Sequence, residues 1–371
     1  MKQKRPERRR VRMAEVVKEI KKIANDVYNK IMKKKAPSLE MPIRSLQNVS
    51  YDSKNGYFEL KGKIMSRTLA ASTIKTFAQT LLMMNESKKI VETDDIATKR
   101  EVYYVSKNWG DAMFREQPES DTVMDDIEAM IGVNREQLGF IPEEKGGDIA
   151  GRLIVLDKDE DGKQIKIDCT RFGSGAYSIP SSVEELKFET SAKFILAIET
   201  AGMFQRLVKH GYWKKANCIL ISMGGVPTRA CRRFIRRLSD DKKLPVYVFT
   251  DGDPYGYLNI YRTLKVGSGN AAHLNKYFCV PRAQFIGVTP QDIIDYKLPT
   301  HPLKDVDIKR IKDGIKNDPF VKEHKEWEKA LNLMTKMGKR AEQQAFAKYT
   351  LNYVMEKYLP DKLKNTKTWL P

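Results

Sequence analysis

Apolar residues recur at helical spacing near the start of the chain. Residues 13–35 carry one at every third or fourth position, which predicts an amphipathic helix whose apolar face comprises Val16, Ile20, Ile23, Val27 and Ile31. Pro37 ends this helix, because proline cannot continue it. A D-S-K-N-G turn signal between two short apolar stretches predicts a β-hairpin over residues 51–60. With the basic residues 1–12, which we expect to form a mobile arm, these elements make an N-terminal segment over residues 1–65.

Short helical patterns fill residues 66–156. Three of them are followed by Gly-rich turns and a small hairpin, an order typical of a winged helix and also of other small α+β units; they span residues 70–82, 94–107 and 123–131. Residues 157–190 alternate apolar stretches with turns, which predicts a β linker. Its first turn, D-K-D-E-D-G, does not predict a calcium loop, because Asp168 stands where such a loop requires its twelfth-position glutamate.

The pattern changes to alternating strands and helices over residues 191–371. Continuous apolar runs predict strands at 194–198, 218–223, 246–250 and 285–288, and the helical patterns between them lie at 203–209, 228–238 and 255–264. Such alternation is typical of βαβ units and a mostly parallel sheet. A charged helical stretch, 306–363, is expected to support this sheet, with Trp327 and Leu331 on buried faces. The fold class is therefore α/β, a multi-domain α+β arrangement.

Composition narrows the class of partner. The 371 residues carry a net charge of +19, which favours a polyanion, nucleic acid above all. No stretch approaches the roughly 18 uninterrupted apolar residues of a membrane span, and no apolar segment follows the basic start as in a secretory signal. The four cysteines lie far apart and are expected to be reduced thiols. We therefore expect a cytoplasmic protein, associated with the nucleoid if its partner is DNA.

Acidic residues follow two of the predicted strands. Glu199 comes directly after the strand at 194–198, and Asp251 and Asp253 follow the strand at 246–250. Carboxyl ends of parallel strands meet at one edge of a sheet, so the three carboxylates can lie together. Clustered oxygen ligands suit Mg²⁺, which shares its remaining positions with water and phosphate. The alternative is that these acids only cap the helices that follow.

This arrangement resembles the Toprim domain of topoisomerases and primases. Further stretches make the chain similar to the A subunit of archaeal DNA topoisomerase VI, a relative of the meiotic double-strand-break transesterase: T-K-R-E-V-Y-Y at 98–104, M-G-G-V-P-T-R-A at 223–230, F-T-D-G-D-P-Y-G at 249–256 and L-K-V-G-S at 264–268. The resemblance implies a winged-helix (CAP-like) domain followed by a Toprim domain. Gly224 departs from the family, where many relatives carry lysine, and leaves the contacts with DNA phosphates to Arg229, Arg232, Arg233 and Lys265.

A tyrosine nucleophile fits reversible DNA cleavage, because a phenol with a pKa near 10 leaves more readily in the reverse step than a serine hydroxyl. Spacing leaves two candidates open. Arg100 precedes Tyr104 by four residues and so shares its helix face, and Lys99 stands in the same relation to Tyr103. The family pattern of Arg, an acid, an apolar residue, an aromatic and the catalytic Tyr implies Tyr104, with Arg100 to stabilise charge.

The resemblance also implies a mechanism and partners. Tyr104 would attack a phosphodiester of double-stranded DNA, leaving a 5′-phosphotyrosyl end, while Glu199, Asp251 and Asp253 hold one or two Mg²⁺ ions. A homodimer would cut both strands. The chain lacks a G-x-x-x-x-G-K-[ST] phosphate loop, so ATP would be bound by a B subunit with a GHKL-type ATPase, in a heterotetramer of two A and two B chains. The helix at 13–35 either docks this B subunit or packs on its own winged helix.

Two other functions remain open on the residues alone. A Toprim nuclease would use the acids and metal to activate water, with the tyrosines purely structural, and would release DNA without attached protein. A non-catalytic winged-helix scaffold would bind DNA through its charge, and Asp251→Asn would leave every DNA-dependent activity intact.

Overall fold

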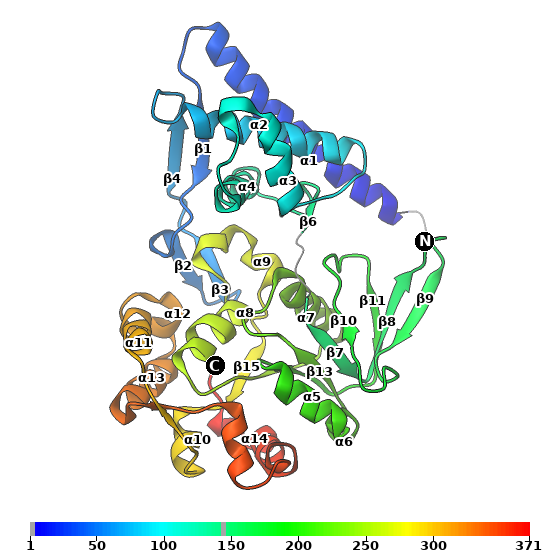
Figure 1. Cartoon of the computed structure of the whole chain (residues 1–371), viewed down its shortest axis with the longest axis vertical. Coiled ribbons are helices and arrows are strands. Elements are labelled where there is room, and N and C mark those ends of the chain that lie inside the picture. The colour runs from blue at the N-terminus through cyan, green and yellow to red at the C-terminus, as the bar shows by residue number, and fades with distance from the viewer. Residues whose placement is uncertain (1–3, 142–145) are drawn as a thin grey trace. The chain divides into compact units, whose positions relative to one another are not determined.

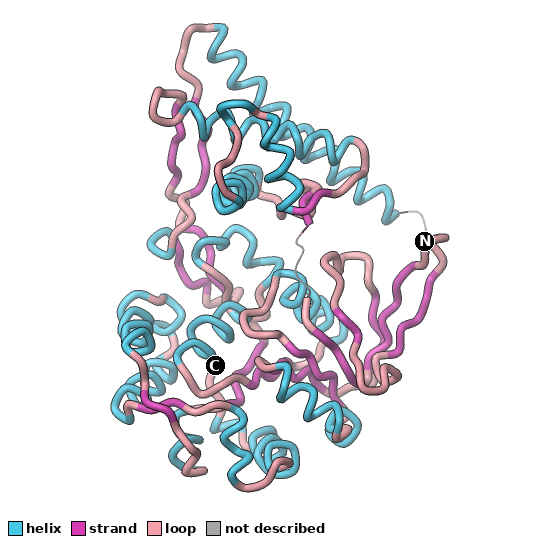
Figure 2. The backbone as a smooth tube through the Cα atoms, viewed as in Figure 1, coloured by secondary structure: helices cyan, strands magenta, loops and turns pink. Residues whose placement is uncertain are grey.

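A computed structural model of the chain describes the backbone of residues 4–141 and 146–371, and within these ranges the side chains from residue 14 onward (Figures 1 and 2). The chain folds into two compact units. Unit 1 comprises residues 1–49, 60–144 and 269–274, and unit 2 comprises residues 50–59, 145–268 and 275–371. Most of the hairpin that the sequence places in the N-terminal segment, β2 (Val49–Asp52) and β3 (Tyr57–Leu60), therefore belongs to unit 2.

Unit 1 is mainly helical. Its first helix, α1 (Lys4–Met32), begins within the basic residues that the sequence predicted to be a mobile arm, so that prediction is wrong from Lys4 onward. The helices α2 (Ile74–Glu92), α3 (Lys99–Val105) and α4 (Gln117–Ile131) follow in the predicted order. Two small sheets accompany them: β1 (Ser38–Pro42) is antiparallel to β4 (Ile64–Thr68), and β5 (Ala97–Thr98) is parallel to β6 (Phe140–Ile141).

The small hairpin expected after α4 does not form within the described residues. There β6 pairs with β5, and the next strand, β7 (Asp148–Gly151), joins the large sheet of unit 2. The core of unit 1 gathers apolar residues from all four of its helices, including Val16 and Ile20 of α1. This packing is the one predicted for an N-terminal helix that packs on its own unit, whereas Ile31 near the end of α1 is exposed.

A small antiparallel sheet occupies the region predicted as a β linker and begins four residues before it, at Leu153. Its order is β11-β8-β9, with bounds Lys187–Thr190, Leu153–Lys158 and Gln164–Asp168. The acidic D-K-D-E-D-G stretch forms the turn between β8 and β9, where Asp159 accepts hydrogen bonds from the backbone N–H groups of Gly162 and Lys163. The turn closes a hairpin, as the sequence indicated.

The large sheet of unit 2 has the order β10-β7-β13-β12-β14-β15. The four parallel strands are those predicted from apolar runs: β12 (Phe194–Ile198), β13 (Cys218–Ser222), β14 (Val246–Phe249) and β15 (Ala283–Gly287). Their residues are almost all buried, as expected for parallel strands covered on both faces. The antiparallel strands β7 and β10 (Tyr177–Ser178) were not predicted.

Helices surround this sheet. Those between and after its strands are α5 (Ala201–Lys209), α6 (Tyr212–Ala216), α7 (Arg229–Lys242), α8 (Arg262–Lys265), α9 (Asn275–Phe278) and α10 (Pro290–Asp295). The segment predicted as a helix at 255–264 begins with a π-helical turn, Gly256–Tyr261. The C-terminal part contains α11 (Asp305–Asn317), α12 (Pro319–Glu323), α13 (Lys325–Met337) and α14 (Leu359–Lys364), with β16 (His301–Pro302) antiparallel to β17 (Lys339–Arg340).

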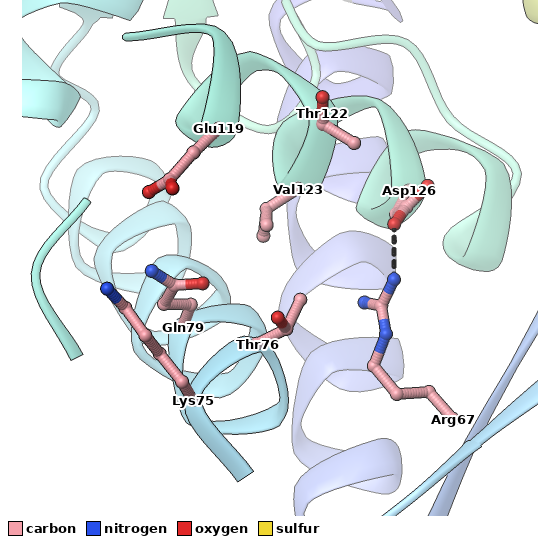
Figure 3. Close-up of a pocket in the computed structure, with 8 residues that line it drawn as sticks. All are labelled: Arg67, Lys75, Thr76, Gln79, Glu119, Thr122, Val123 and Asp126. Atoms are coloured by element: carbon pink, nitrogen blue, oxygen red, sulfur yellow. Dashed lines mark hydrogen bonds and ion pairs between the residues drawn. The ribbon is translucent and has the colours of Figure 1, made fainter. Parts of the chain in front are cut away.

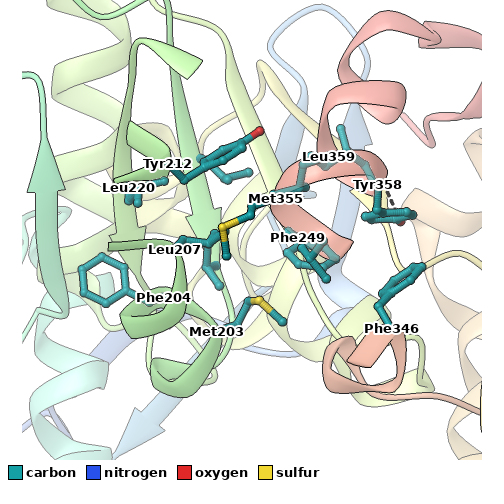
Figure 4. Close-up of a cluster of buried hydrophobic side chains, with 14 of the residues drawn as sticks. Met203, Phe204, Leu207, Tyr212, Leu220, Phe249, Phe346, Met355, Tyr358 and Leu359 are labelled. Atoms are coloured by element: carbon teal, nitrogen blue, oxygen red, sulfur yellow. Dashed lines mark hydrogen bonds between the residues drawn. The ribbon is translucent and has the colours of Figure 1, made fainter. Parts of the chain in front are cut away.

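The C-terminal part supports the sheet as expected. Phe346, Met355, Tyr358 and Leu359 pack into one cluster with residues of β12, β13, β14 and α5 (Figure 4). Trp327 and Leu331 are buried, which confirms that prediction. The four cysteines are buried and free, as the sequence indicated.

Candidate active site

The acidic residues predicted at the sheet edge lie on neighbouring strands. Because β12 pairs with β14 in parallel, the residues that follow both strands come together. The backbone N–H of Asp251 donates to Glu199 Oε2 at 2.8 Å, which joins the two strand ends directly. The sequence predicted only that both strand ends meet at one edge of the sheet, and the register shows that β12 and β14 are neighbours.

A C-terminal segment, residues 340–343, holds this edge in place. The backbone N–H of Gln343 donates to Asp251 Oδ1 at 2.8 Å, and its side-chain Nε2 donates to Phe249 O at 2.8 Å. Gly252 and Ala341 exchange backbone hydrogen bonds of 2.7 and 3.2 Å. No motif in the sequence predicted a role for this segment. A signal existed in the polar run K-R-A-E-Q-Q, which directly follows the helix-ending Gly338.

Asp253 uses both carboxylate oxygens in other contacts. Oδ1 accepts from the backbone N–H of Gly256 at 2.7 Å, and Oδ2 lies 3.3 Å from Arg340 Nη1. Gly256 is required here, since a Cβ would lie 2.7 Å from Asp251 O. Asp253 is therefore held toward Arg340.

The electrostatics of the edge are those of crowded, partly buried carboxylates. Burial, with the charge of Asp251, raises the pKa of Glu199 to about 8. Burial, with the charges of Asp253 and Glu342, raises the pKa of Asp251 to about 6. Glu342 is exposed and was not predicted. A divalent cation would relieve this repulsion and favour the ionised forms.

The donor set fits a hard cation. Glu199 and Asp251 each keep one oxygen that accepts no hydrogen bond from the described residues. Within those same ranges, no three acidic, histidine or cysteine side chains already stand close enough to hold a metal ion. Two of the three predicted acids thus each have an oxygen open to a metal ion, whereas Asp253 would have to turn from Arg340.

The two tyrosines of α3 have different surroundings. Tyr103 Oη donates to Arg115 O at 3.1 Å, and the ammonium of Lys107 lies 4.1 Å from its ring centre. Tyr104 is 56% exposed, and no hydrogen bond of the described residues engages its hydroxyl. A free, accessible hydroxyl suits a nucleophile, so the structure favours Tyr104 where spacing alone could not choose.

The basic neighbours of these tyrosines differ in the same way. Lys99 forms an ion pair with Asp121 at 2.7 Å, whereas Arg100 is exposed and makes no ion pair with a described residue. Arg100 and Tyr104 share the solvent side of α3. A capping box between Thr98 and Glu101 fixes the start of the helix.

Comparison with known proteins identifies the family. Three family models match in chain order: "Type IIB DNA topoisomerase" at residues 75–140, "All-beta domain in DNA topoisomerase VI alpha subunit" at 143–192, and the Toprim domain of the topoisomerase 6 A subunit and Spo11 at 194–363. The A subunit of type 2 DNA topoisomerase 6 from Methanocaldococcus jannaschii is 57% identical over 94% of both chains. The chain belongs to the family of topoisomerase VI A subunits.

Other members of the family support this assignment. The corresponding subunit of Archaeoglobus fulgidus is 38% identical over 92% of this chain and 94% of its own, and that of Methanothermobacter thermautotrophicus is 36% identical over 94% and 97%. The resemblance seen in the sequence motifs is therefore confirmed, and the chain is a type IIB topoisomerase subunit with a Toprim domain.

None of the helices in the described residues is long and apolar enough to cross a membrane.

The basic residues expected to contact DNA in this topoisomerase subunit do not all face solvent. Arg229 and Arg233 are half-buried, and Arg233 is paired with Glu184 at 2.6 Å. Arg232 and Lys265 are buried, and the ammonium of Lys265 donates to Ala283 O at 2.7 Å. Neither charge is presented at the surface, so we do not propose these two residues as DNA contacts.

A polar pocket lies in unit 1 of this topoisomerase chain, between β4, α2 and α4 (Figure 3). The ion pair of Arg67 with Asp126, 2.8 Å long, closes one side, and the opposite side carries Lys75 and Glu119. Opposite charges line it in equal number, so it has no net preference for a phosphate or for a cation. It does not contain Arg100 or Tyr104.

Proposed function

We propose that this chain is the DNA-cleaving subunit of a type IIB topoisomerase, with Tyr104 as nucleophile. The observation that carries the proposal is the exposed, unengaged hydroxyl of Tyr104, four residues after the exposed Arg100. The phenol loses its proton to solvent, its oxygen bonds to phosphorus, and the bond from phosphorus to the 3′ oxygen breaks as that oxygen takes up a proton. The products are a 5′-phosphotyrosyl end and a 3′-hydroxyl, and religation reverses each step.

Different residues of the chain would have different roles in cleavage. The Arg100 guanidinium stabilises negative charge on the phosphate or the phenolate. Glu199 and Asp251 would hold a Mg²⁺ ion, joined by Asp253 when it leaves Arg340, and the ion would stabilise charge on the phosphate and the 3′ oxygen. Arg229 and Arg233 remain the candidate contacts with the DNA backbone.

The proposal extends to the assembly. As the resemblance implies, the tyrosine of one protomer would act with the acids of its partner, so a dimer cuts both strands of duplex DNA. ATP would be bound by a B subunit, which couples its hydrolysis to strand passage and relaxation of supercoils, in a heterotetramer of two A and two B chains.

The test compares Tyr104→Phe with Tyr103→Phe, a matched change on the neighbouring residue. Each protein is mixed with the B subunit, Mg²⁺, a nonhydrolysable ATP analogue and internally labelled supercoiled plasmid, then quenched with detergent. We expect cut DNA attached to protein with wild type and Tyr103→Phe, and none with Tyr104→Phe. Cut DNA without attached protein would favour the nuclease. Cleavage undiminished in Asp251→Asn would exclude a role for the acids.

A further inference from the structure

A positively charged side chain, that of Arg340, forms an ion pair at the acidic edge of unit 2. The Arg340 side chain extends from β17, with Nη1 3.3 Å from Asp253 Oδ2 and Nε 3.7 Å from Asp307 Oδ2. Its Nε is buried and makes no hydrogen bond to a described residue. The side chain is 22% exposed, so it lies at the boundary between the interior and solvent.

Arg340 differs from the basic residues that the sequence singled out. Lys265 and Arg232 are buried, and Arg233 donates to both oxygens of Glu184 and to Tyr277 O. Arg340 is instead anchored by the segment that touches Asp251, because Gln343, three residues later, donates to that carboxylate. Its guanidinium therefore sits beside the place where a phosphate bound near Glu199 and Asp251 would lie.

Asp253 cannot serve two cations in the observed arrangement. Its Oδ1 accepts from Gly256, which leaves Oδ2 as the oxygen that Arg340 occupies. If Asp253 turns to a divalent cation, the guanidinium loses this partner, and the planar fork of its two Nη groups becomes free to donate, while Nε stays beside Asp307. Such a fork matches the oxygens of a phosphate diester.

We propose that Arg340 is a further DNA-contacting residue, which pairs with Asp253 in the free protein and transfers to a DNA phosphate when a divalent cation takes Asp253. The inference rests on the proposed function of the acidic edge. The exchange makes metal binding and DNA binding mutually favourable. A metal ion takes Asp253 away from Arg340, and a DNA phosphate takes Arg340 away from Asp253.

Two consequences distinguish this exchange from a purely structural ion pair. Without DNA, Arg340 competes with the metal for Asp253, so Arg340→Gln binds the metal more tightly, by about fivefold if the competition is worth one pairing of surface charges. With DNA, the guanidinium neutralises a phosphate only when metal is present. The dependence of DNA affinity on salt is then steeper in Mg²⁺ than in EDTA by about 0.9 per protomer.

The experiment uses the full chain with Mn²⁺ titrated by electron paramagnetic resonance, and with duplex DNA titrated by fluorescence anisotropy over a range of NaCl in Mg²⁺ or EDTA. For Arg340→Gln we expect tighter Mn²⁺ binding and loss of the extra salt dependence in Mg²⁺. Lys339→Gln removes an exposed neighbouring charge and is the matched control, whose Mn²⁺ affinity we expect to equal that of wild type. Circular dichroism checks that each variant folds.

Asp253→Asn gives an independent arm, because it removes the carboxylate that faces Arg340 Nη1 and leaves the arginine itself unchanged, with Nε still beside Asp307. We expect its salt dependence in EDTA to rise to the wild-type value in Mg²⁺. Unchanged Mn²⁺ affinity in Arg340→Gln, or an unchanged salt dependence in EDTA for Asp253→Asn, would overturn the exchange. Mn²⁺ binding undiminished in Asp251→Asn would instead refute the metal site of the proposed function.

Discussion

Lys265 directs its ammonium group into the interior of unit 2, and this makes stability depend on pH. Burial lowers the pKa of Lys265 to about 8. Its ammonium donates to Ala283 O, which also accepts from Tyr261 Oη at 3.1 Å. In Lys265→Met the carbonyl therefore keeps one partner, and the charge disappears.

The magnitude follows from the two pKa values. A fall from 10.5 to about 8 corresponds to about 3 kcal/mol at about 1.4 kcal/mol per pH unit. The unfolded chain binds more protons than the folded chain between these values, so this lysine lowers stability fully below pH 8 and less as pH rises toward 10.5. Losing one hydrogen bond costs about 1 kcal/mol, so Lys265→Met gains about 2 kcal/mol at neutral pH.

Scanning calorimetry of wild type and Lys265→Met between pH 7.5 and 10 measures this gain. A domain of this size shifts by about 2–4 °C per kcal/mol, so we expect the variant to melt roughly 4–8 °C higher at neutral pH, with the gap closing as pH rises. Lys242→Met, at an exposed position, is the control, and we expect its melting temperature to stay near that of wild type at each pH. A gap that does not change with pH would refute the reasoning. An altered salt dependence of DNA binding would show that Lys265 reaches DNA.

Three further changes test local features by their effect on melting. Lys362→Met leaves Asp292 buried without its 2.8 Å ion pair and should cost roughly 3–5 kcal/mol; a loss below about 1 kcal/mol would contradict a buried pair. Asp126→Asn leaves the nearly buried Arg67 without its ion pair and Arg44 with Asp125 alone, and should cost roughly 3 kcal/mol, which unchanged melting would disprove. Thr98→Ala removes the cap on the Glu101 N–H and should cost about 1 kcal/mol, seen as faster amide exchange at the start of α3, whereas Thr98→Ser should not.

The sequence predicted the parallel strands well because each is a continuous apolar run. Such runs have few alternatives to burial in the middle of a sheet, and β12 agrees with its predicted bounds. The short strands β7 and β10 escaped prediction, since Asp148–Gly151 and Tyr177–Ser178 are too brief to show a period. Pairing with β13, distant in the chain, is what makes β7 a strand.

The start of α1 was mispredicted for a related reason. Residues 4–12 carry almost only charge, and charge by itself gives no helical period. The helix that the apolar face of α1 nucleates nevertheless continues through them, because extending an existing helix costs far less than starting one.

The sequence by itself determined which chemical groups this protein has and the order in which they occur: a Tyr-Tyr pair on a helix, then acids after two apolar strands. These are local features, read from residue type and spacing. Tertiary structure decided which tyrosine has an unengaged hydroxyl, that β12 and β14 are neighbours, and that Gln343 and Arg340 reach the acids. Tertiary structure also decided that Lys265 and Arg232 are buried. Most of these outcomes depend on contacts between segments far apart in the chain, which residue type and spacing do not reveal.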